Sequence, residues 1–357
     1  MEKMVIMKKN FWSGRTVLIT GHTGFKGSWL ALWLNYLGAN VIGISLKPIS
    51  NPNLYNLSYI YDFAQSNYCD IRDSKLINEL LRAAKPEIIF HLAAQPLVML
   101  SYRNPIDTYS TNIMGTLNIL DAIRETKFVK VVVAITSDKV YKNNDSYYPY
   151  RESDILGGHD PYSASKAACE ILISSYRDAF LQKQGIALAS ARAGNVIGGG
   201  DWSEDRLIPD AMRAWQVGRT LEIRRPKAIR PWQHVLEPLH GYLTLAEKLW
   251  QHPELAGAYN FGPNTNDTAT VKDVIELART AYGRGEVCYG DGSEGPHESS
   301  RLAMEVSRAK ILLNVQPRWS LAEALTRTIA WYQSQLVGED ARSLCLRDIA
   351  DYELAKE

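Results

Sequence analysis

Cysteine is scarce in this chain, and the few that occur lie far apart. The 357 residues include only Cys69, Cys169, Cys288 and Cys345, and no C-x-x-C spacing is present. Disulfide frameworks and structural zinc sites usually need cysteines that are closer together and paired. The sequence therefore predicts reduced thiols, no metal site and a cytoplasmic protein.

An excess of charge of one sign is also missing. There are 40 Lys and Arg against 39 Asp and Glu, for a net charge of +1, which excludes a strong field directed at nucleic acid or an anionic membrane. Long hydrophobic runs are missing too: the apolar residues 131–135 are far too few to cross a bilayer. Residues 1–10 lack the apolar segment of a signal peptide.

The first half of the chain alternates short β-branched runs with longer helical patterns. This alternation is typical of an α/β fold with a doubly wound parallel sheet covered by helices on both faces. Strands are predicted at 16–20, 41–45, 87–91, 130–137 and 186–192, and helices at 28–37, 74–84, 113–125 and 164–181. Beyond Gly194, glycine and proline become frequent, which indicates a smaller mixed α/β domain with late helices at 271–281 and 321–335. Some of its strands are expected to return to the first sheet.

A glycine-rich turn lies between the first predicted strand and the first predicted helix. Such a turn lets the backbone approach a pyrophosphate, and the following helix N-terminus offers N–H groups to the anion. The alternative is a loop that merely reverses the chain, but the strand–turn–helix context favours dinucleotide binding. The cofactor-binding residues predicted here are Gly21, Thr23, Gly24, Phe25, Lys26 and Gly27.

The end of the second predicted strand lacks the acidic residue that often holds the ribose of NAD. Ser45 occupies that place, with Lys47 nearby, so the choice between NAD and NADP stays open at this point. Further cofactor contacts are expected from residues that follow later strands, namely Asp70, Ile71, Ala93 and Ala94. His91 is interpreted as a structural residue.

Two motifs carry groups suited to proton transfer. Ser137, Asp138 and Lys139 follow a buried strand at its carboxyl end, where doubly wound sheets bind ligands. Tyr162 and Lys166 lie four residues apart on a predicted helix, so a lysine ammonium can favour the tyrosine phenolate. Each motif alone is more typical of an ordinary loop or surface helix. Together they predict an alcohol oxidation coupled to a nicotinamide.

These motifs together resemble the extended short-chain dehydrogenase/reductase superfamily of nucleotide-sugar enzymes. Asp138-Lys139 is similar to the dehydratase branch, and the longer blocks 192–202, 206–210 and 230–238 resemble the CDP-glucose 4,6-dehydratase family. The resemblance extends from about Phe11 to Tyr352. It implies a Rossmann domain over 1–192, a nucleotide-sugar-binding domain over 193–357, NAD as cofactor and a homodimer or higher homo-oligomer.

The resemblance also implies residue roles. Tyr162 would take the proton of the sugar 4-hydroxyl, Lys166 would lower the pKa of Tyr162 and bind the nicotinamide ribose, and Ser137 would bind the 4-oxygen. Asp138 and Lys139 would serve water elimination, although Lys139 stands where related dehydratases carry Glu. The substrate-binding residues implied are Asn195, Arg206, Leu207, Arg230 and His297.

Three alternatives remain at the level of sequence. The chain could be a nucleotide-sugar 4-epimerase, a dehydratase for another nucleotide sugar, or a non-catalytic NAD(P)-binding regulator. Retention of both Tyr162 and Lys166 counts against the regulator. No single residue dictates cytidine over uridine or thymidine, so the base preference comes from the resemblance alone.

Overall fold

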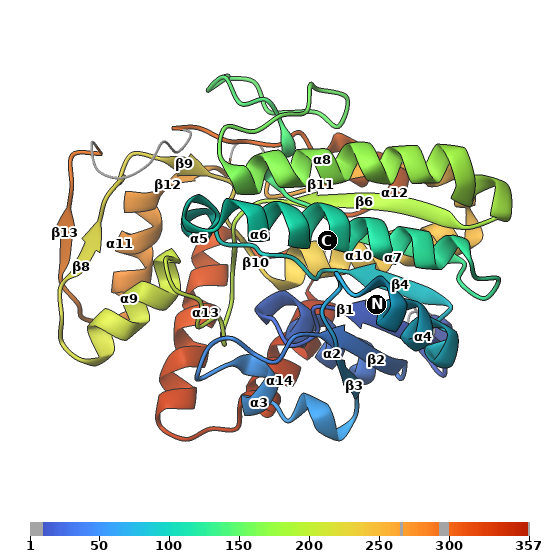
Figure 1. Cartoon of the computed structure of the whole chain (residues 1–357). Coiled ribbons are helices and arrows are strands. Elements are labelled where there is room, and N and C mark those ends of the chain that lie inside the picture. Colours follow the sequence, from blue (N-terminus) through green and yellow to red (C-terminus); the bar gives the residue numbers. More distant parts are fainter. Residues whose placement is uncertain (1–9, 265–266, 293–299, 356–357) are drawn as a thin grey trace.

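Seven parallel strands form the sheet that carries the rest of the molecule (Figure 1). The computed structural model describes residues 10–264, 267–292 and 300–355. The strand order is β11-β6-β5-β4-β1-β2-β3, and every neighbouring pair is parallel. The strands are β1 Thr16–Thr20, β2 Asn40–Ser45, β3 Gln65–Tyr68, β4 Ile88–His91, β5 Val131–Ile135, β6 Ala187–Ala193 and β11 Ala258–Phe261.

The chain changes direction across the sheet at β1. It first builds β2 and β3 on one side of β1, and it then builds β4, β5 and β6 on the other. In such a doubly wound sheet, ligands bind beyond the carboxyl ends of the strands at this switch point. The expected α/β, Rossmann-type fold is therefore confirmed, and the switch lies between the ends of β1 and β4.

Helices cover both faces of the sheet. One face packs against α4 (Ser74–Ala84), α7 (Gly115–Arg124) and α8 (Pro161–Tyr176) through one apolar cluster. The other face packs against α2 (Phe25–Tyr36) and α10 (Leu236–Gln251), with α14 (Ala341–Leu354) contributing to the same larger cluster (Figure 1). Shorter helices complete this part: α3 Leu54–Leu57, α5 Val98–Arg103, α6 Pro105–Tyr109 and α12 Ser307–Leu313.

A second lobe of shorter elements lies beside the carboxyl ends of the sheet (Figure 1). It contains α9 (Leu207–Gln216), α11 (Val271–Tyr282) and α13 (Leu321–Leu336). Three two-stranded sheets complete it: β7 (Val196–Ile197) with β10 (Gln233–His234), β8 (Leu221–Ile223) with β13 (Val287–Tyr289), and β9 (Ile229–Arg230) with β12 (Ala269–Thr270). β11, although late in the chain, pairs with β6 in the large sheet.

Most of the predicted elements are present, and the differences have local causes. The helix predicted at 28–37 begins earlier, at Phe25, directly after the glycine turn. The predicted helices 113–125 and 164–181 each contain a π-helical turn, at Ser110–Met114 before α7 and at Arg177–Leu181 after α8. The strand predicted at 130–137 stops at Ile135, because the chain turns at its polar end.

α10 and α14 are helices that are not predicted from the sequence. α10 contains Pro238 and Gly241, which usually interrupt helices, and almost all of its faces are buried. Pro238 lies in the first turn, where a missing N–H costs no intrahelical hydrogen bond. Polar residues recur along α10 at helical spacing, so Pro238 and Gly241 are what hide this helix in the sequence.

A buried ion pair joins α8 to the sheet. Glu170 Oε2 accepts hydrogen bonds from Arg192 Nη2 at 2.7 Å and from Ser190 Oγ at 2.8 Å, and Oε1 accepts from Thr136 Oγ1 at 2.5 Å. Arg192 also donates to the Tyr141 hydroxyl at 2.9 Å. A buried charge that keeps its partner is stable, whereas one that loses its partner is strongly destabilising. This network fixes the helix that carries Tyr162 and Lys166.

The ion pair generates a stability prediction. Arg192→Met leaves the Glu170 carboxylate buried without its cation, and it should lower the free energy of unfolding by about 3–5 kcal/mol. The double variant Arg192→Met/Glu170→Gln keeps an amide oxygen and an amide nitrogen that can hydrogen-bond the Thr136 and Ser190 hydroxyls without a buried charge, so it should recover a large part of the loss. Urea unfolding measures both variants. A double variant no more stable than Arg192→Met alone would contradict this account.

Candidate active site

Two glycines of the turn after β1 have no room for a side chain. Gly21 has a φ of +79°, and a Cβ there would lie 2.8 Å from the Ala93 backbone nitrogen. A Cβ on Gly27 would lie 2.1 Å from the Gly21 carbonyl oxygen. Any residue with a Cβ would make contacts too short to occur at these two positions. Glycine therefore allows α2 to pack closely against the ends of β1 and β4.

Gly24 differs from the other two glycines, because it faces open space. It is exposed and directly precedes α2, and a Cβ there would meet only the Gly21 carbonyl oxygen, at 3.4 Å. The first turn of a helix leaves backbone N–H groups without intrahelical partners, which makes it a ready site for a phosphate. The turn and the start of α2, with Phe25 and Lys26, can therefore hold a dinucleotide pyrophosphate.

The residues predicted for the ribose and adenine lie beside this turn. Thr23 Oγ1 donates to the Leu46 carbonyl at 2.8 Å and lies 2.7 Å from Ser45 Oγ, which ties the end of β2 to the turn. The Lys47 ammonium is 5.9 Å from the centre of the Tyr68 ring. Neutral hydroxyls therefore occupy the place where many such folds carry an acid.

The other predicted cofactor residues are partly engaged by the protein. Asp70 pairs with Arg72 at 2.6 Å, and the hydrogen bonds from Arg72 lower the pKa of the Asp70 carboxyl. Ile71 is buried against Gly115, where a Cβ would lie 2.3 Å from Ile71 Cδ1. Ala93 donates its N–H to Thr20 Oγ1 at 3.1 Å, and Ala94 follows it, partly exposed.

His91 is held within the core. Its Nδ1 lies 2.7 Å from Thr20 Oγ1 and its Nε2 lies 2.9 Å from Thr116 Oγ1. Burial lowers the pKa of His91 to about 3, and the nearby Lys166 ammonium lowers it further. A neutral imidazole with both nitrogens engaged agrees with the structural role that the sequence analysis gives it.

The three residues that follow β5 form a compact polar cluster. Ser137 and Asp138 are buried, and Asp138 is only 1% exposed. Asp138 Oδ1 accepts hydrogen bonds from Ser137 Oγ and Lys139 Nζ, both at 3.1 Å. Asp138 Oδ2 is buried and has no hydrogen-bond partner among the described residues. The cluster thus combines a hydroxyl, a carboxyl group and an amine beside the switch point.

Tyr162 and Lys166 lie on the first turns of α8, which starts after the capping residue Asp160. Both are buried, and Lys166 Nζ donates to the Ile135 carbonyl at the end of β5, at 3.2 Å. Burial raises the pKa of the Tyr162 phenol to about 12, the side-chain hydrogen bond with Ser137 lowers it, and the Asp138 charge raises it. The predicted tyrosine, serine and aspartate therefore meet in one place.

The electrostatic role expected for Lys166 toward Tyr162 stays a prediction. The cation that lowers the pKa of Tyr162 most strongly is Arg206, from the second lobe, rather than Lys166. Burial lowers the pKa of Lys166 itself, with the nearby Cys169 and Glu170 opposing that shift. The i, i+4 spacing anticipates a pair on one helix face, but it carries no information about a cation from another lobe.

Lys26 connects the phosphate turn to the catalytic cluster. Burial lowers the pKa of Lys26 to about 7. Arg206 lowers it as well, Asp138 opposes the shift, and Lys166 and Lys139 lower it further. The second residue of α2 therefore faces the same region as the strand-end residues, and several cations share that region with Asp138.

The predicted substrate residues come from the second lobe and its junction with β6. Arg206 directly precedes α9, of which Leu207 is the first residue, and it pairs with the buried Asp201 at 3.2 Å. Arg230 lies in β9 and is buried. Asn195 lies between β6 and β7, and its side-chain oxygen is buried without a hydrogen-bond partner in the described part of the chain. His297 lies outside the described residues.

Tyr242, which the sequence analysis does not single out, also belongs to this region. It is carried by α10, and the charges of Tyr162 and Asp138 both act on its hydroxyl. No sequence motif contains Tyr242. Its approach to the strand-end residues follows from helix packing alone.

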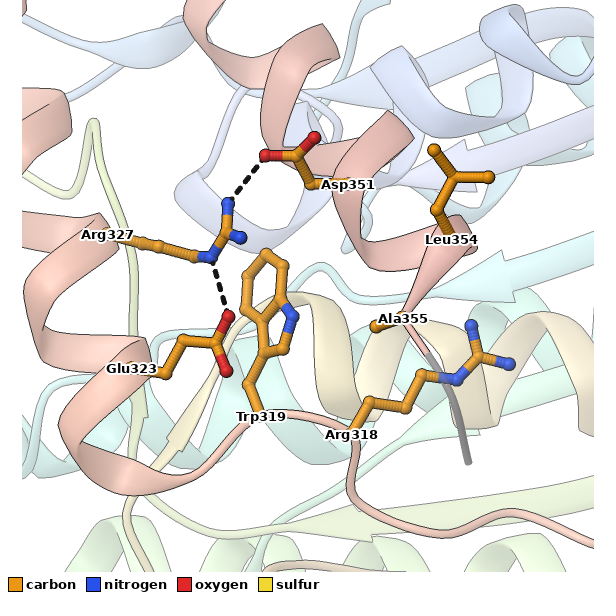
Figure 2. A pocket seen from close by; sticks show the side chains of 7 residues that line it. All are labelled: Arg318, Trp319, Glu323, Arg327, Asp351, Leu354 and Ala355. Carbon is orange, nitrogen blue, oxygen red and sulfur yellow. Dashed lines mark hydrogen bonds and ion pairs between the residues drawn. The ribbon is translucent and has the colours of Figure 1, made fainter.

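A separate surface pocket lies between α13 and α14, away from the strand ends (Figure 2). It has a volume of about 390 Å³ and is lined by Arg318, Trp319, Glu323, Arg327, Asp351, Leu354 and Ala355. Arg327 donates to Glu323 at 3.1 Å and to Asp351 at 2.8 Å, and its guanidinium lies 4.2 Å from the Trp319 ring centre (Figure 2). We interpret this pocket as an ion-pair network joining two helices.

The remaining structural observations concern metals, thiols and membranes. Among the residues that the structure describes, no group of three or more His, Cys, Asp or Glu side chains is placed to hold a metal ion. All four cysteines are free thiols. No helix in the described ranges is long and apolar enough to span a membrane.

Lys26 generates a pH-dependent stability prediction. Its folded-state pKa of about 7 is below its ordinary value of 10.5, so the unfolded chain binds more protons between these values. The free energy of unfolding should therefore rise with pH across this window. The full free-energy cost of burying the charged Lys26 ammonium should be present below about pH 7. Lys26→Met removes that cost, and it should raise the Tm most near neutral pH and least near pH 10.

The matched control is Lys75→Met, because Lys75 is an exposed lysine on α4. Thermal unfolding of the wild type and both variants across this pH range measures the difference. A Lys26→Met variant whose Tm differs from the wild type by the same amount at every pH would contradict the assigned burial of Lys26.

Known proteins resemble this chain along nearly its whole length. The chain is 44% identical to the CDP-glucose 4,6-dehydratase of Salmonella typhimurium over 353 residues, which covers 97% of this chain and 98% of that protein. It is 24% identical to a dTDP-glucose 4,6-dehydratase of Xanthomonas campestris, covering 89% of this chain and 93% of that protein.

Solved structures share the fold. A dTDP-glucose 4,6-dehydratase from Bacillus anthracis, solved in complex with NAD, superposes with a TM-score of 0.76 at 21% identity and covers 91% of this chain and 98% of that chain. An epimerase from Methanothermobacter thermautotrophicus superposes with a TM-score of 0.81 at 24% identity, covering 94% and 96%. The family model described as GDP-mannose 4,6 dehydratase matches residues 18–328. The chain belongs to the GDP-mannose 4,6-dehydratase family.

Proposed function

We propose that this protein is an NAD-dependent CDP-glucose 4,6-dehydratase, a hydro-lyase that converts CDP-D-glucose to CDP-4-dehydro-6-deoxy-D-glucose. The observation that carries the proposal is 44% identity to the Salmonella CDP-glucose 4,6-dehydratase along nearly the full length of both chains. The meeting of Ser137, Asp138 and Tyr162 in one buried cluster supports it, because the reaction needs an oxidation and an elimination at one sugar.

The residues of the glycine turn fit a dinucleotide cofactor. Gly21 and Gly27 close the turn without side chains, and Gly24 faces open space at the start of α2. NAD, when bound, accepts the hydride from C4 of the sugar and later returns it to C6. In this proposal Gly21, Thr23, Gly24, Phe25, Lys26, Gly27 and Ser45 bind it, together with Asp70, Ile71, Ala93, Ala94, Tyr162 and Lys166.

Tyr162 takes the proton of the sugar 4-hydroxyl in this proposal. Its phenol is buried, and both the Ser137 hydrogen bond and the Arg206 charge oppose the effect of burial on its pKa. The Ser137 hydroxyl also binds the 4-oxygen as it becomes a carbonyl. Lys166, fixed by the Ile135 carbonyl, binds the nicotinamide ribose. Oxidation makes the C5 proton acidic and prepares the elimination.

Elimination uses the two neighbouring residues Asp138 and Lys139. Lys139 removes the C5 proton, and the C5–H electron pair forms the C5–C6 double bond. Asp138 gives a proton to the departing 6-hydroxyl, which leaves as water when the C6–O bond breaks. Hydride then returns to C6 and a proton to C5, so no net oxidation occurs. Lys139 Nζ donates to Asp138 Oδ1 at 3.1 Å, and passage of this proton from the ammonium to the carboxylate leaves the neutral amine and the protonated carboxyl group that the elimination needs.

The second lobe holds the nucleotide in this proposal. Arginine suits a diphosphate because its planar guanidinium donates two parallel hydrogen bonds. Arg206 acts on both Lys26 and Tyr162, which supports its place beside the reacting groups. The proposed substrate-binding residues are Asn195, Arg206, Leu207, Arg230 and His297. We also propose that the chain divides into a Rossmann domain over 1–192 and a substrate domain over 193–357.

We also propose a homodimer formed through α6, α7 and α8. These helices lie side by side on one face of the molecule (Figure 1). Large apolar side chains are exposed there, including Ile106, which is 83% exposed, Ile171, which is 63% exposed, and Met114. We further propose a cytoplasmic location, supported by the four free thiols, and a role in deoxysugar synthesis for surface polysaccharide.

A substrate panel tests the proposed function. CDP-, UDP-, dTDP- and GDP-linked sugars are incubated with the protein and either NAD or NADP, and products are weighed by mass spectrometry. CDP-glucose with NAD should lose one water and retain its nucleotide. Epimerisation would leave the mass unchanged, so a turned-over CDP-glucose of unchanged mass would contradict dehydration.

Lys139→Met tests the elimination step. The variant should bind NAD as tightly as the wild type, because Lys139 lies on the turn after β5 and not on the glycine turn. Water loss from CDP-glucose should be abolished, since no base then removes the C5 proton. Lys127→Met, at an exposed lysine, is the matched control and should dehydrate normally. Full-rate dehydration by Lys139→Met would rule out the assigned role.

A further inference from the structure

The segment that connects β5 to α8 reaches a strand-like run of the chain more than 150 residues away in the sequence. Asp145 Oδ1 accepts hydrogen bonds from the N–H of Ser300 at 2.9 Å and from the N–H of Arg301 at 3.2 Å. Asn143 Nδ2 donates to the Arg301 carbonyl at 3.0 Å. Both backbone groups of Arg301 are therefore held by side chains of this segment. We call Asn143 and Asp145 the Arg301 clamp.

The Arg301 clamp is itself fixed by hydrogen bonds. Asn143 Oδ1 accepts from the Tyr150 hydroxyl at 2.9 Å and from the Asp145 N–H at 2.7 Å. Tyr150 is buried, its N–H donates to the Ala303 carbonyl at 2.9 Å, and its carbonyl accepts from the Glu305 N–H at 2.8 Å. Because the clamp is already ordered, little conformational entropy is lost when it binds the backbone of Arg301.

The other edge of the run 300–302 pairs with β9. Ile229 donates its N–H to the Ser300 carbonyl at 2.9 Å, and its own carbonyl accepts from the Leu302 N–H at 3.2 Å. Ile229 and Arg301 thus form a parallel bridge. In such a pair the backbone groups of alternate residues point to opposite sides. Ser300 and Leu302 therefore bind β9, while Arg301 presents its N–H and carbonyl to the clamp.

β9 carries Arg230 into the candidate active site. β9 has only two residues, so its position depends on the chain segments beside it, and β12 pairs with Arg230 on the other side. The next residue, Pro231, packs closely on Gly194, because a Cβ on Gly194 would lie 2.4 Å from Pro231 Cγ and 3.2 Å from Asp138 Oδ2. The end of β9 therefore lies beside the catalytic cluster.

We propose that Asp145 is a positioning residue for Arg230: by holding the run 300–302 against β9, it keeps the Arg230 guanidinium aligned with the diphosphate of the nucleotide sugar. The inference rests on the proposed function, in which Arg230 binds that diphosphate. A guanidinium donates two parallel hydrogen bonds to a phosphate only in a narrow range of orientations, so a small displacement of β9 weakens binding. Asp145 acts through the backbone and does not contact the substrate in this proposal.

Asp145→Gly tests this role. The backbone of Asp145 has a φ of +52°, which glycine adopts without strain, so the variant removes the hydrogen-bond acceptor and keeps the turn. The KM for CDP-glucose and the Kd for CDP, measured by calorimetry, should both rise at least about fivefold. The kcat and the Kd for NAD should stay unchanged, because Lys139, Tyr162 and the glycine turn lie on other elements.

Two further variants control for a merely structural effect. Asp145→Asn should bind CDP like the wild type, because asparagine tolerates the same backbone conformation and its amide oxygen accepts the same two N–H groups. Asp154→Gly is the matched control, since Asp154 Oδ2 accepts only within its own segment, from the Arg151 N–H at 2.8 Å. It should leave the Kd for CDP unchanged. An Asp145→Gly variant that binds CDP like the wild type would overturn the proposal, and so would an Asp145→Asn variant as weak as Asp145→Gly.

A double-mutant cycle with Arg230→Met decides whether Asp145 acts through Arg230. In the Arg230→Met background, Asp145→Gly should weaken CDP binding no further, because the guanidinium that it positions is gone. Additive losses would overturn the proposal. If the wild type binds CDP but dehydrates no nucleotide sugar, the proposed reaction fails and the cycle still tests the inference. If the wild type binds no CDP, the substrate role of Arg230 fails and the inference fails with it.

Discussion

Loss of solvent at the carboxyl ends of the sheet is the constraint on which the candidate active site depends. Burial is the largest influence on the pKa values of Lys26, Tyr162 and Lys166, and it disfavours the charged form of each. In such surroundings the electrostatic interaction with each charged neighbour is stronger than it would be in water. Arg206 and Asp138 therefore act in opposite directions on the pKa values of Lys26 and Tyr162, in addition to the effect of burial.

The fold supplies that buried region by bringing distant segments together. The close approach of Gly27 to Gly21 places α2 and Lys26 over the ends of β1 and β4. The ion pair of Glu170 with Arg192 fixes α8, and with it Tyr162 and Lys166, against β5 and β6. α10 reaches the same cluster from the opposite face of the sheet. The contacts that stabilise the fold thus also position the groups of the candidate active site.

The bounds of many strands and helices can be predicted from the local sequence pattern, because that pattern determines which residues can be buried together. β1, α4 and α11 have the expected bounds to within a residue, because β1 is a short run of buried apolar residues and the two helices each bury one face and expose the rest. The motifs around Gly21, Ser137 and Tyr162 were found for a similar reason: backbone freedom and proton transfer each demand particular residue types. α10 is not predicted because Pro238 and Gly241 interrupt its pattern.

Residue types and their spacing were sufficient to indicate a parallel sheet, a dinucleotide turn and a tyrosine–lysine pair, because these depend on neighbours within a few positions along the chain. Packing alone decided that Arg206 rather than Lys166 is the cation acting most strongly on the Tyr162 phenol. Packing also places Tyr242 where the charge of Asp138 raises the pKa of its hydroxyl, although the two residues are far apart in the sequence. Burial and charge act through space, so their effects between residues that are distant in the sequence cannot be predicted from a local sequence pattern.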